Sequence, residues 1–121
     1  MTSAAVKATF ERILNKDTKA AAAANFGSIA SIDTPDDNTA VFNLSTADVP
    51  LLTAMSSLNA AIVKADAAKS GDFKSTAIGT GPFKLTSWTP DEKTELPTHT
   101  YCWGGKIAIA GLEIRIIPYE T

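Results

Sequence analysis

Apolar residues recur every three or four positions at the start of the chain, which is the spacing of an amphipathic helix. From Ser3 to Asn15 this pattern predicts a helix, and Ser3 is available as its N-cap. The run Ala20–Ala24 that follows has high helix propensity but little surface to bury. It is typical of a short helix or a close-packed connection.

Three further segments in the first part of the chain have recognisable patterns. Pro50 favours the first turn of a second helix, which we expect to end by Ser56–Ser57. The apolar run Ala60–Val63 predicts a short buried strand. A small helix is then expected over Lys64–Lys69, with Gly71 as its terminator.

Alternation of apolar and polar residues predicts strands elsewhere. Two strands are expected between Phe26 and Leu44, joined by the turn residues Pro35–Asn38. After Gly79–Pro82 the pattern again favours strands, with a turn at Thr89–Glu92 and alternation at Leu112, Ile114 and Ile116. The elements together predict an α+β fold in which two or three helices pack with a small mixed sheet.

Composition narrows the class of protein. The chain has 121 residues, of which 45% are hydrophobic and 20% charged, so we expect a single globular domain over residues 1–121. A net charge of −2 with scattered Lys and Arg argues against a nucleic-acid partner. The apolar runs are too short to span a bilayer, and the amino terminus has no apolar core of a signal peptide. The single cysteine, Cys102, excludes an internal disulfide.

Six phrases along the chain carry further information: A-V-K-A-T-F-E-R-I-L at residues 5–14, P-D-D-N-T-A-V-F-N-L at 35–44, L-N-A-A-I-V at 58–63, G-T-G-P-F-K-L at 79–85 with Trp88 after it, W-G-G-K at 103–106, and I-R-I-I-P at 114–118. In this order they resemble the extracytoplasmic solute-binding proteins that serve dipeptide, oligopeptide and nickel ABC importers. Order and spacing agree over nearly the whole chain, which is far more specific than one glycine-rich motif.

The resemblance implies a periplasmic or extracytoplasmic parent protein with two lobes that close on a ligand, of which this chain is a stretch of the first lobe. It also implies that the parent is not an enzyme: it captures a peptide or similar small solute for an ABC permease and needs no cofactor. Polar groups often line the ligand cleft of the family where this chain has Ser56, Ser57 and Asn59. We therefore expect these residues to contact ligand.

The sequence departs from the family pattern at four places. Ala5 stands where an Asp usually caps the helix, Ile107 where a Pro follows W-G-G-K, and Tyr119 where an Asp is common; residues 97–102, P-T-H-T-Y-C, replace the usual E-R-N-P-x-Y. Two origins would explain these departures. The chain is either an excised domain whose core was altered where it lost neighbours, or a scaffold whose surface was engineered to bind a protein. The second predicts a partner-binding interface of Thr98, His99, Thr100, Tyr101, Ile107 and Tyr119.

Other chemical groups favour structural roles. One His and one Cys, His99 and Cys102, do not provide the ligands of a zinc site or the orienting group of a catalytic dyad. Gly79–Pro82 lacks the Lys-Ser/Thr end of a phosphate-binding loop, so a structural turn is expected. We expect Trp88 and Trp103 to be core residues.

The apolar segment Ile107–Ala110 bears on whether the chain associates with a second copy of itself. Because Ile107 restores a backbone donor that proline would lack, this apolar segment is predicted to pair readily. It would either extend the sheet of its own chain or form a symmetric homodimer, with Cys102 close to the contact.

Overall fold

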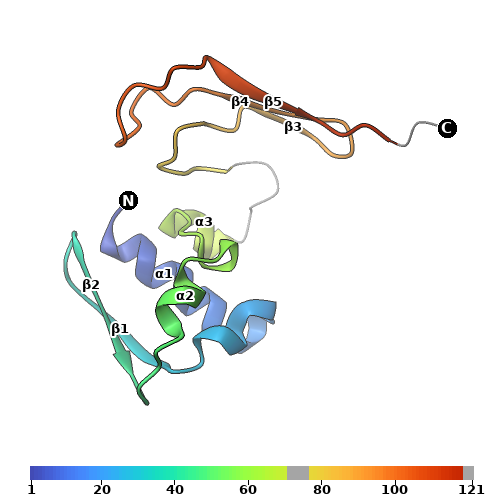
Figure 1. Ribbon diagram of the computed structural model, residues 1–121. Helices are drawn as coiled ribbons and strands as arrows, with labels where there is room; N and C mark the ends of the chain where they lie inside the picture. The colour runs from blue at the N-terminus through green and yellow to red at the C-terminus, as the bar shows by residue number, and fades with distance from the viewer. Residues whose placement is uncertain (71–76, 119–121) are drawn as a thin grey trace. The chain divides into compact units, whose positions relative to one another are not determined.

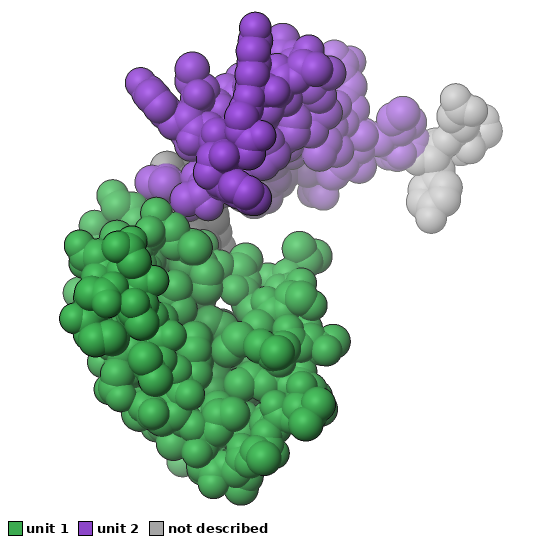
Figure 2. All heavy atoms as spheres, turned by 60° about the vertical axis from the view of Figure 1, so that its left-hand side comes forward, with its two compact units in different colours: residues 1–71 green, residues 72–121 purple. Residues whose placement is uncertain are grey.

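The computed structural model describes residues 1–70 and 77–118 (Figure 1). The chain divides into two compact units, residues 1–71 and residues 72–121 (Figure 2). The described part of the first unit contains helices and one hairpin, and that of the second contains strands and loops. The organisation of residues 1–121 as one domain stays a prediction.

The α+β class is confirmed. The described strands lie in two antiparallel sheets, β1–β2 and β3–β4–β5, where the sequence predicts one small mixed sheet. Short turns join β1 to β2 and β3 to β4, and connections this short permit only antiparallel pairing.

Helix α1 (Ser3–Leu14) opens the first unit, as the apolar periodicity predicts. Its N-cap is Thr2, so the prediction of an N-cap at Ser3 is wrong by one residue. The Ser3 side chain is buried, and its hydroxyl donates a hydrogen bond to the Asp36 carbonyl oxygen at 2.5 Å. Ser3 therefore ties the start of the helix to the hairpin instead of capping the helix.

Two 3₁₀ helices follow, η1 (Lys16–Thr18) and η2 (Ala21–Phe26). The second contains most of the alanine run, which confirms the short helix allowed by the sequence. Its last residue, Phe26, is 0% exposed. Small alanine side chains let this segment lie close to its neighbours, and Phe26 provides the large apolar group that anchors it.

Strands β1 (Ile29–Asp36) and β2 (Thr39–Leu44) form the predicted hairpin. At the turn the Asp36 carboxylate accepts a hydrogen bond from the Asn38 backbone N–H at 2.8 Å. This hydrogen bond, with a smaller contribution from Thr39, lowers the pKa of Asp36. Asp36 is therefore a turn-forming residue, in agreement with the turn expected at Pro35–Asn38.

The hydrophobic core of the first unit forms where α1, η2 and the hairpin meet. Phe10 is central: its ring makes edge-to-face contacts with Phe26, at a centroid distance of 5.2 Å, and with Phe42, at 5.1 Å. Edge-to-face geometry is favourable for aromatic pairs beyond the area that they bury. The buried members of the core are Phe10, Ile13, Phe26, Ile29, Ile32, Leu51 and Ala60.

The rest of the first unit consists of α2 (Leu51–Met55), η3 (Leu58–Ala60) and α3 (Ala65–Ser70). Both predicted helices are confirmed, and Gly71 lies outside the described residues. The strand predicted over residues 60–63 is wrong, because Ala60 ends η3 and residues 61–64 have no strand partner in the described chain. The Val63 N–H instead donates to the Thr9 side-chain oxygen at 3.1 Å.

The second unit contains β3 (Ser87–Thr89), β4 (Lys93–Pro97) and β5 (Gly111–Arg115). The turn after β3 and the strand pattern near Leu112 and Ile114 agree with the sequence prediction, whereas β4 was not predicted. Gly111 lies opposite Pro97, and a Cβ atom at Gly111 would be only 3.0 Å from the Pro97 Cα. Glycine therefore permits the close approach of β4 and β5 at this end of the sheet.

The segment before β5 extends this sheet by hydrogen bonds. The Thr98 N–H donates to the Ala110 carbonyl oxygen at 3.0 Å, and the Thr98 hydroxyl donates to that of Ile109 at 2.6 Å. The first alternative predicted for Ile107–Ala110, extension of its own sheet, therefore agrees with the structure at residues 109–110. The homodimer stays a prediction.

Candidate functional site

The three residues predicted to contact ligand lie close together in the turn that runs from the end of α2 into η3: Ser56 and Ser57 follow α2, and Asn59 is the middle residue of η3. The Ser56 hydroxyl donates to the Thr53 carbonyl oxygen, and the Ser57 hydroxyl donates to that of Ala54, both at 2.7 Å. Both serines thus satisfy carbonyl groups at the end of α2. Their oxygen atoms can still accept hydrogen bonds from a ligand.

Buried residues hold this turn on both sides. Leu51 at the start of α2 and Ala60 at the end of η3 are each 6% exposed and belong to the core. Between them Asn59 is exposed, and Leu58 is 95% exposed. A turn anchored in this way presents an amide and an aliphatic side chain outward, which are the groups that bind polar and apolar parts of a solute.

The predicted interface residues Thr98 to Tyr101 lie in a loop that is attached to the Gly79–Pro82 turn. The His99 N–H donates to the Pro82 carbonyl oxygen at 2.8 Å, and His99 Nδ1 lies 3.2 Å from that of Gly81. These contacts give Gly79–Pro82 the structural role expected from its sequence. Ile107 is half-buried beyond the loop, and Tyr119 lies outside the described residues.

Aromatic residues of the second unit are more exposed than the sequence suggested. The prediction that Trp88 and Trp103 are core residues is wrong for this chain, since they are 50% and 86% exposed. Tyr101 is 89% exposed, and its ring contacts the His99 ring edge-on at a centroid distance of 6.4 Å.

His99 and Cys102 are joined through the backbone. The Cys102 N–H donates to the His99 carbonyl oxygen at 3.2 Å, which makes the pair part of a turn. Within residues 1–70 and 77–118, no three His, Cys, Asp or Glu residues are grouped so that they could hold a metal ion. Across the same residues, no helix has the length and apolar character needed to cross a membrane.

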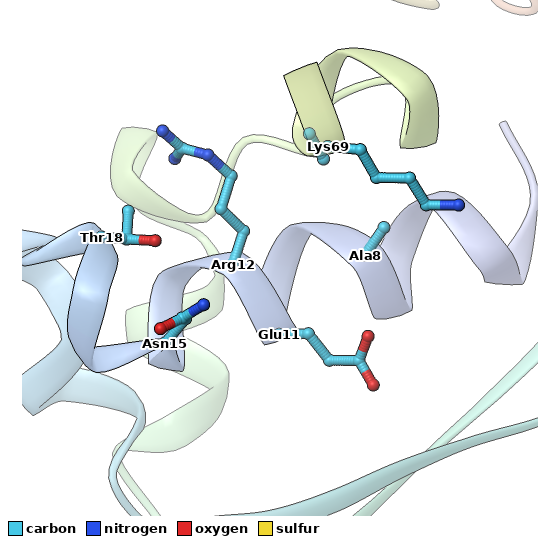
Figure 3. Close-up of a pocket in the computed structure, with 7 residues that line it drawn as sticks. Ala8, Glu11, Arg12, Asn15, Thr18 and Lys69 are labelled. Carbon is cyan, nitrogen blue, oxygen red and sulfur yellow. The ribbon is translucent and has the colours of Figure 1, made fainter. Parts of the chain in front are cut away.

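A groove of about 530 Å³ lies between α1 and α3 in the first unit (Figure 3). Glu11 is paired with Lys7 at 3.8 Å, and the Arg12 side chain extends toward the Thr18 end of the groove. The sequence analysis did not select these residues: Arg12 lies in the last turn of α1, Asn15 is its C-cap, and Thr18 ends η1. The lining residues are Ala8, Glu11, Arg12, Asn15, Thr18, Ala68 and Lys69.

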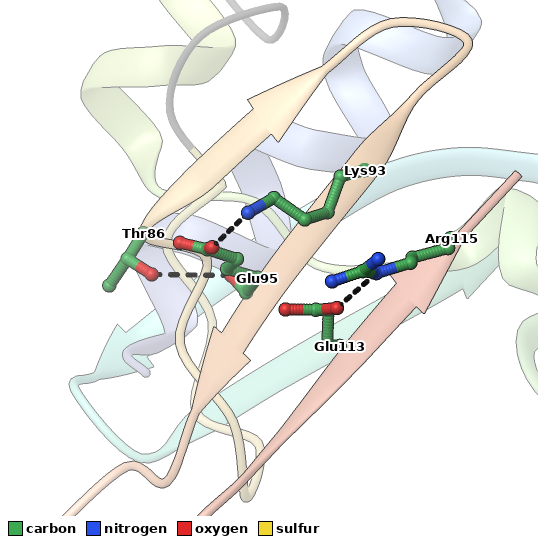
Figure 4. A network of polar contacts seen from close by, with 5 residues as sticks. All are labelled: Thr86, Lys93, Glu95, Glu113 and Arg115. Carbon is green, nitrogen blue, oxygen red and sulfur yellow. Dashed lines mark hydrogen bonds and ion pairs between the residues drawn. The ribbon is translucent and has the colours of Figure 1, made fainter.

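Four charged residues form a network on one face of the β3–β4–β5 sheet (Figure 4). Lys93 Nζ lies 2.6 Å from a Glu95 carboxylate oxygen, and Arg115 pairs with Glu113. The hydrogen bond that Lys93 donates to Glu95 is the main cause of the raised pKa of Lys93. The hydrogen bond from Arg115 is the main cause of the lowered pKa of Glu113.

We expect Arg115→Gln to raise the pKa of Glu113 toward its ordinary value. A carboxylate with a lowered pKa stabilises the folded state at neutral pH, and this stabilisation is lost as the pH falls through the folded-state pKa. An NMR titration of the Glu113 carboxyl carbon measures the change. Arg12→Gln, on α1, is the control and should leave the titration as it is; the same curve in Arg115→Gln would show that Arg115 does not act on Glu113.

Comparisons with known proteins identify the family. A family model described as "Bacterial extracellular solute-binding proteins, family 5 Middle" matches residues 1–121. A Brucella ovis protein, whose name proposes that it is the peptide-binding protein of an ABC transporter, is 34% identical over 112 residues. That match covers 87% of this chain and 21% of the relative, so the chain spans about a fifth of the length of that protein.

Two solved structures are similar to the whole fold or most of it. The periplasmic binding protein AgaA of A. tumefaciens R10, in complex with agropinic acid, has a TM-score of 0.78 and 35% identity over 84% of this chain and 21% of its own. DppA of Helicobacter pylori, in complex with the peptide STSA, has a TM-score of 0.82 and 27% identity over 97% of this chain and 26% of its own. The chain therefore belongs to the bacterial extracellular solute-binding proteins of family 5 and corresponds to a part of a longer protein of that family.

Proposed function

We propose that this chain is part of the solute-capturing component of an ABC importer, which binds a solute without changing it covalently and delivers it to a membrane permease outside the cytoplasm. The observation that carries the proposal is the match of the family over residues 1–121. The chain corresponds to about a fifth to a quarter of its relatives, which supports a binding site that it shares with the remaining polypeptide.

Within this chain we assign ligand contact to the turn that contains Ser56, Ser57 and Asn59. Support comes from its anchoring by buried Leu51 and Ala60 and from the exposed amide of Asn59. An amide both donates and accepts hydrogen bonds, so Asn59 can bind a peptide group or a carboxylate. The two serines bring hydroxyl oxygens to the same turn.

The two similar proteins are bound to different ligands, a peptide in one and agropinic acid in the other. The class of solute that this protein binds is therefore to be identified by experiment. The longer protein that contains this chain would be titrated calorimetrically with short peptides and with agropinic acid. Mass spectrometry of the recovered solute should show an unchanged mass. Binding of neither class, or a covalently altered solute, would contradict the proposal.

Asn59→Ala in the longer protein tests the assignment of the turn. Loss of one hydrogen bond to a polar ligand should weaken binding about tenfold. Leu52→Ala, also exposed and on the preceding helix, is the matched control. If Asn59→Ala binds as tightly as the unaltered protein, the turn does not contact ligand.

A protein-binding scaffold with an altered surface at residues 97–102 stays a second prediction. Exposed Tyr101, on a loop attached through His99, is the residue on which such an interface would depend.

A further inference from the structure

The Thr9 hydroxyl joins two segments of the first unit that are far apart in the sequence. It donates to the Ala5 carbonyl oxygen at 2.8 Å, one turn back along α1, and accepts from the Val63 N–H at 3.1 Å. The Val63 carbonyl oxygen lies 3.4 Å from the same hydroxyl. Because the shorter contact to Ala5 takes the proton, a lone pair of the oxygen is available to the Val63 N–H. Thr9 therefore attaches the backbone at residue 63 to the middle of α1.

The segment that Thr9 holds continues directly from the candidate ligand turn. The Ala60 N–H donates to the Ser57 carbonyl oxygen at 3.1 Å, and the Ala61 N–H donates to that of Leu58 at 3.2 Å. Both of these hydrogen-bonded turns contain Asn59. The backbone on either side of Asn59 is thus tied to the start of residues 61–64, whose position Thr9 fixes.

Apolar packing also holds this segment, but it does not fix its orientation in the same way. Ala60 is buried in the core of the unit, and Ile62 packs against that core. Apolar contacts have no directional preference, whereas a hydrogen bond weakens steeply away from its preferred angle. Thr9 is 4% exposed, so its contact with Val63 is shielded from competing water. Thr9 therefore supplies a directional contact to the segment that follows the turn.

We propose that Thr9 is a positioning residue for solute binding, which acts by fixing the backbone at Val63 and through it the direction of the Asn59 side chain. The inference rests on the proposed function, because it takes the turn to contact the solute. Binding groups have to be held within about 0.5 Å of their productive positions by the residues behind them. Thr9 does this from inside the unit, without touching the solute.

Hydrogen exchange of the longer protein without solute tests the positioning step by itself. In Thr9→Val the amides of Ala60 and Ala61 should exchange at least about tenfold faster, because the turn loses its attachment to α1. Ser3→Ala is the matched control, since it removes another buried hydroxyl of α1, which donates to the Asp36 carbonyl oxygen in the hairpin. It should leave both amides as they are. Equally slow exchange in Thr9→Val and the unaltered protein would overturn the proposal.

Solute affinity shows whether this positioning matters for binding. The probe is whichever of the short peptides and agropinic acid the longer protein binds best, titrated at a temperature where every variant is fully folded. Thr9→Val should weaken binding about tenfold, whereas Thr9→Ser keeps the hydroxyl and should bind nearly as well as the unaltered protein. Ser3→Ala should also bind nearly normally. The proposal is wrong if Thr9→Val and Thr9→Ser bind the probe equally well, or if Ser3→Ala weakens binding as much as Thr9→Val.

A double-mutant cycle with Asn59→Ala separates this proposal from the assignment of the turn. If Thr9 acts through Asn59, Thr9→Val should weaken binding much less in the Asn59→Ala background than in the unaltered protein. A full tenfold loss in both backgrounds would contradict the positioning role and leave the assignment of the turn standing. If Asn59→Ala alone binds as tightly as the unaltered protein, the assignment of the turn fails, and the exchange measurement still decides whether Thr9 holds the turn.

Discussion

Replacing Phe10 with alanine is expected to lower the free energy of unfolding of the first unit by about 3–5 kcal/mol. Phe10 is 2% exposed and contacts both Phe26 and Phe42 edge-to-face, so its removal opens a cavity between α1, η2 and the hairpin. A loss of this size is comparable with the whole stability of a unit of this length. Urea unfolding followed by far-UV circular dichroism measures the difference.

Leu52→Ala is the matched control for Phe10→Ala. Leu52 is a large apolar residue but is 77% exposed, so its truncation should change the free energy of unfolding by less than about 0.5 kcal/mol. Similar unfolding curves for the two variants would mean that the aromatic cluster does not form the core of the unit.

Replacing Thr9 with valine is expected to cost about 1–3 kcal/mol, although the two side chains have nearly the same shape. The Thr9 hydroxyl donates to the Ala5 carbonyl oxygen at 2.8 Å and accepts from the Val63 N–H at 3.1 Å. Valine leaves the Val63 N–H without this partner, and so weakens the attachment of residues 61–64 to α1.

Thr9→Ser keeps the hydroxyl and is the control for this substitution. Urea unfolding should rank the stabilities as unaltered protein, then Thr9→Ser, then Thr9→Val, and amide exchange at Val63 should accelerate most in the valine variant. If valine and serine destabilise equally, packing of the methyl group accounts for the effect and the hydrogen bond contributes little.

Strong periodicity made the first unit largely predictable. The apolar residues of α1 and the turn residues between β1 and β2 act locally, so their consequences can be derived from neighbouring positions. The run at residues 60–63 was misjudged because four apolar residues fit a strand as well as an irregular, partly buried segment. The decisive contact, from the Val63 N–H to Thr9, joins residues 54 positions apart and has no local signal.

The second unit was harder to predict, because its strands depend on pairing with segments that are not adjacent in the sequence. Strand β4 has charged residues at Lys93 and Glu95 and one large apolar residue, Leu96, so its pattern is too weak to indicate a strand alone. Pairing with β5 supplies the missing information. Trp88 was expected in a core because tryptophan is usually well buried, but it is 50% exposed in the structure.

The residues of the candidate ligand turn were chosen because of the family resemblance. The structure adds that the Ser56 and Ser57 hydroxyls donate hydrogen bonds to carbonyl oxygens at the end of α2. The groove beside Arg12 went unnoticed because its other wall comes from α3, more than fifty residues later in the sequence. Spacing on one helix can show a polar face but not the element that lies across from it.

A titration of one solute into both the 121-residue chain and the longer protein tests most directly whether this chain holds only part of a binding site. The solute would be whichever of the short peptides and agropinic acid the longer protein binds best. We expect the 121-residue chain to bind it at least about a hundredfold more weakly, equivalent to about 2.7 kcal/mol, because the remaining contacts are missing. Equal affinity for the two proteins would contradict a divided site and place the whole site within these 121 residues.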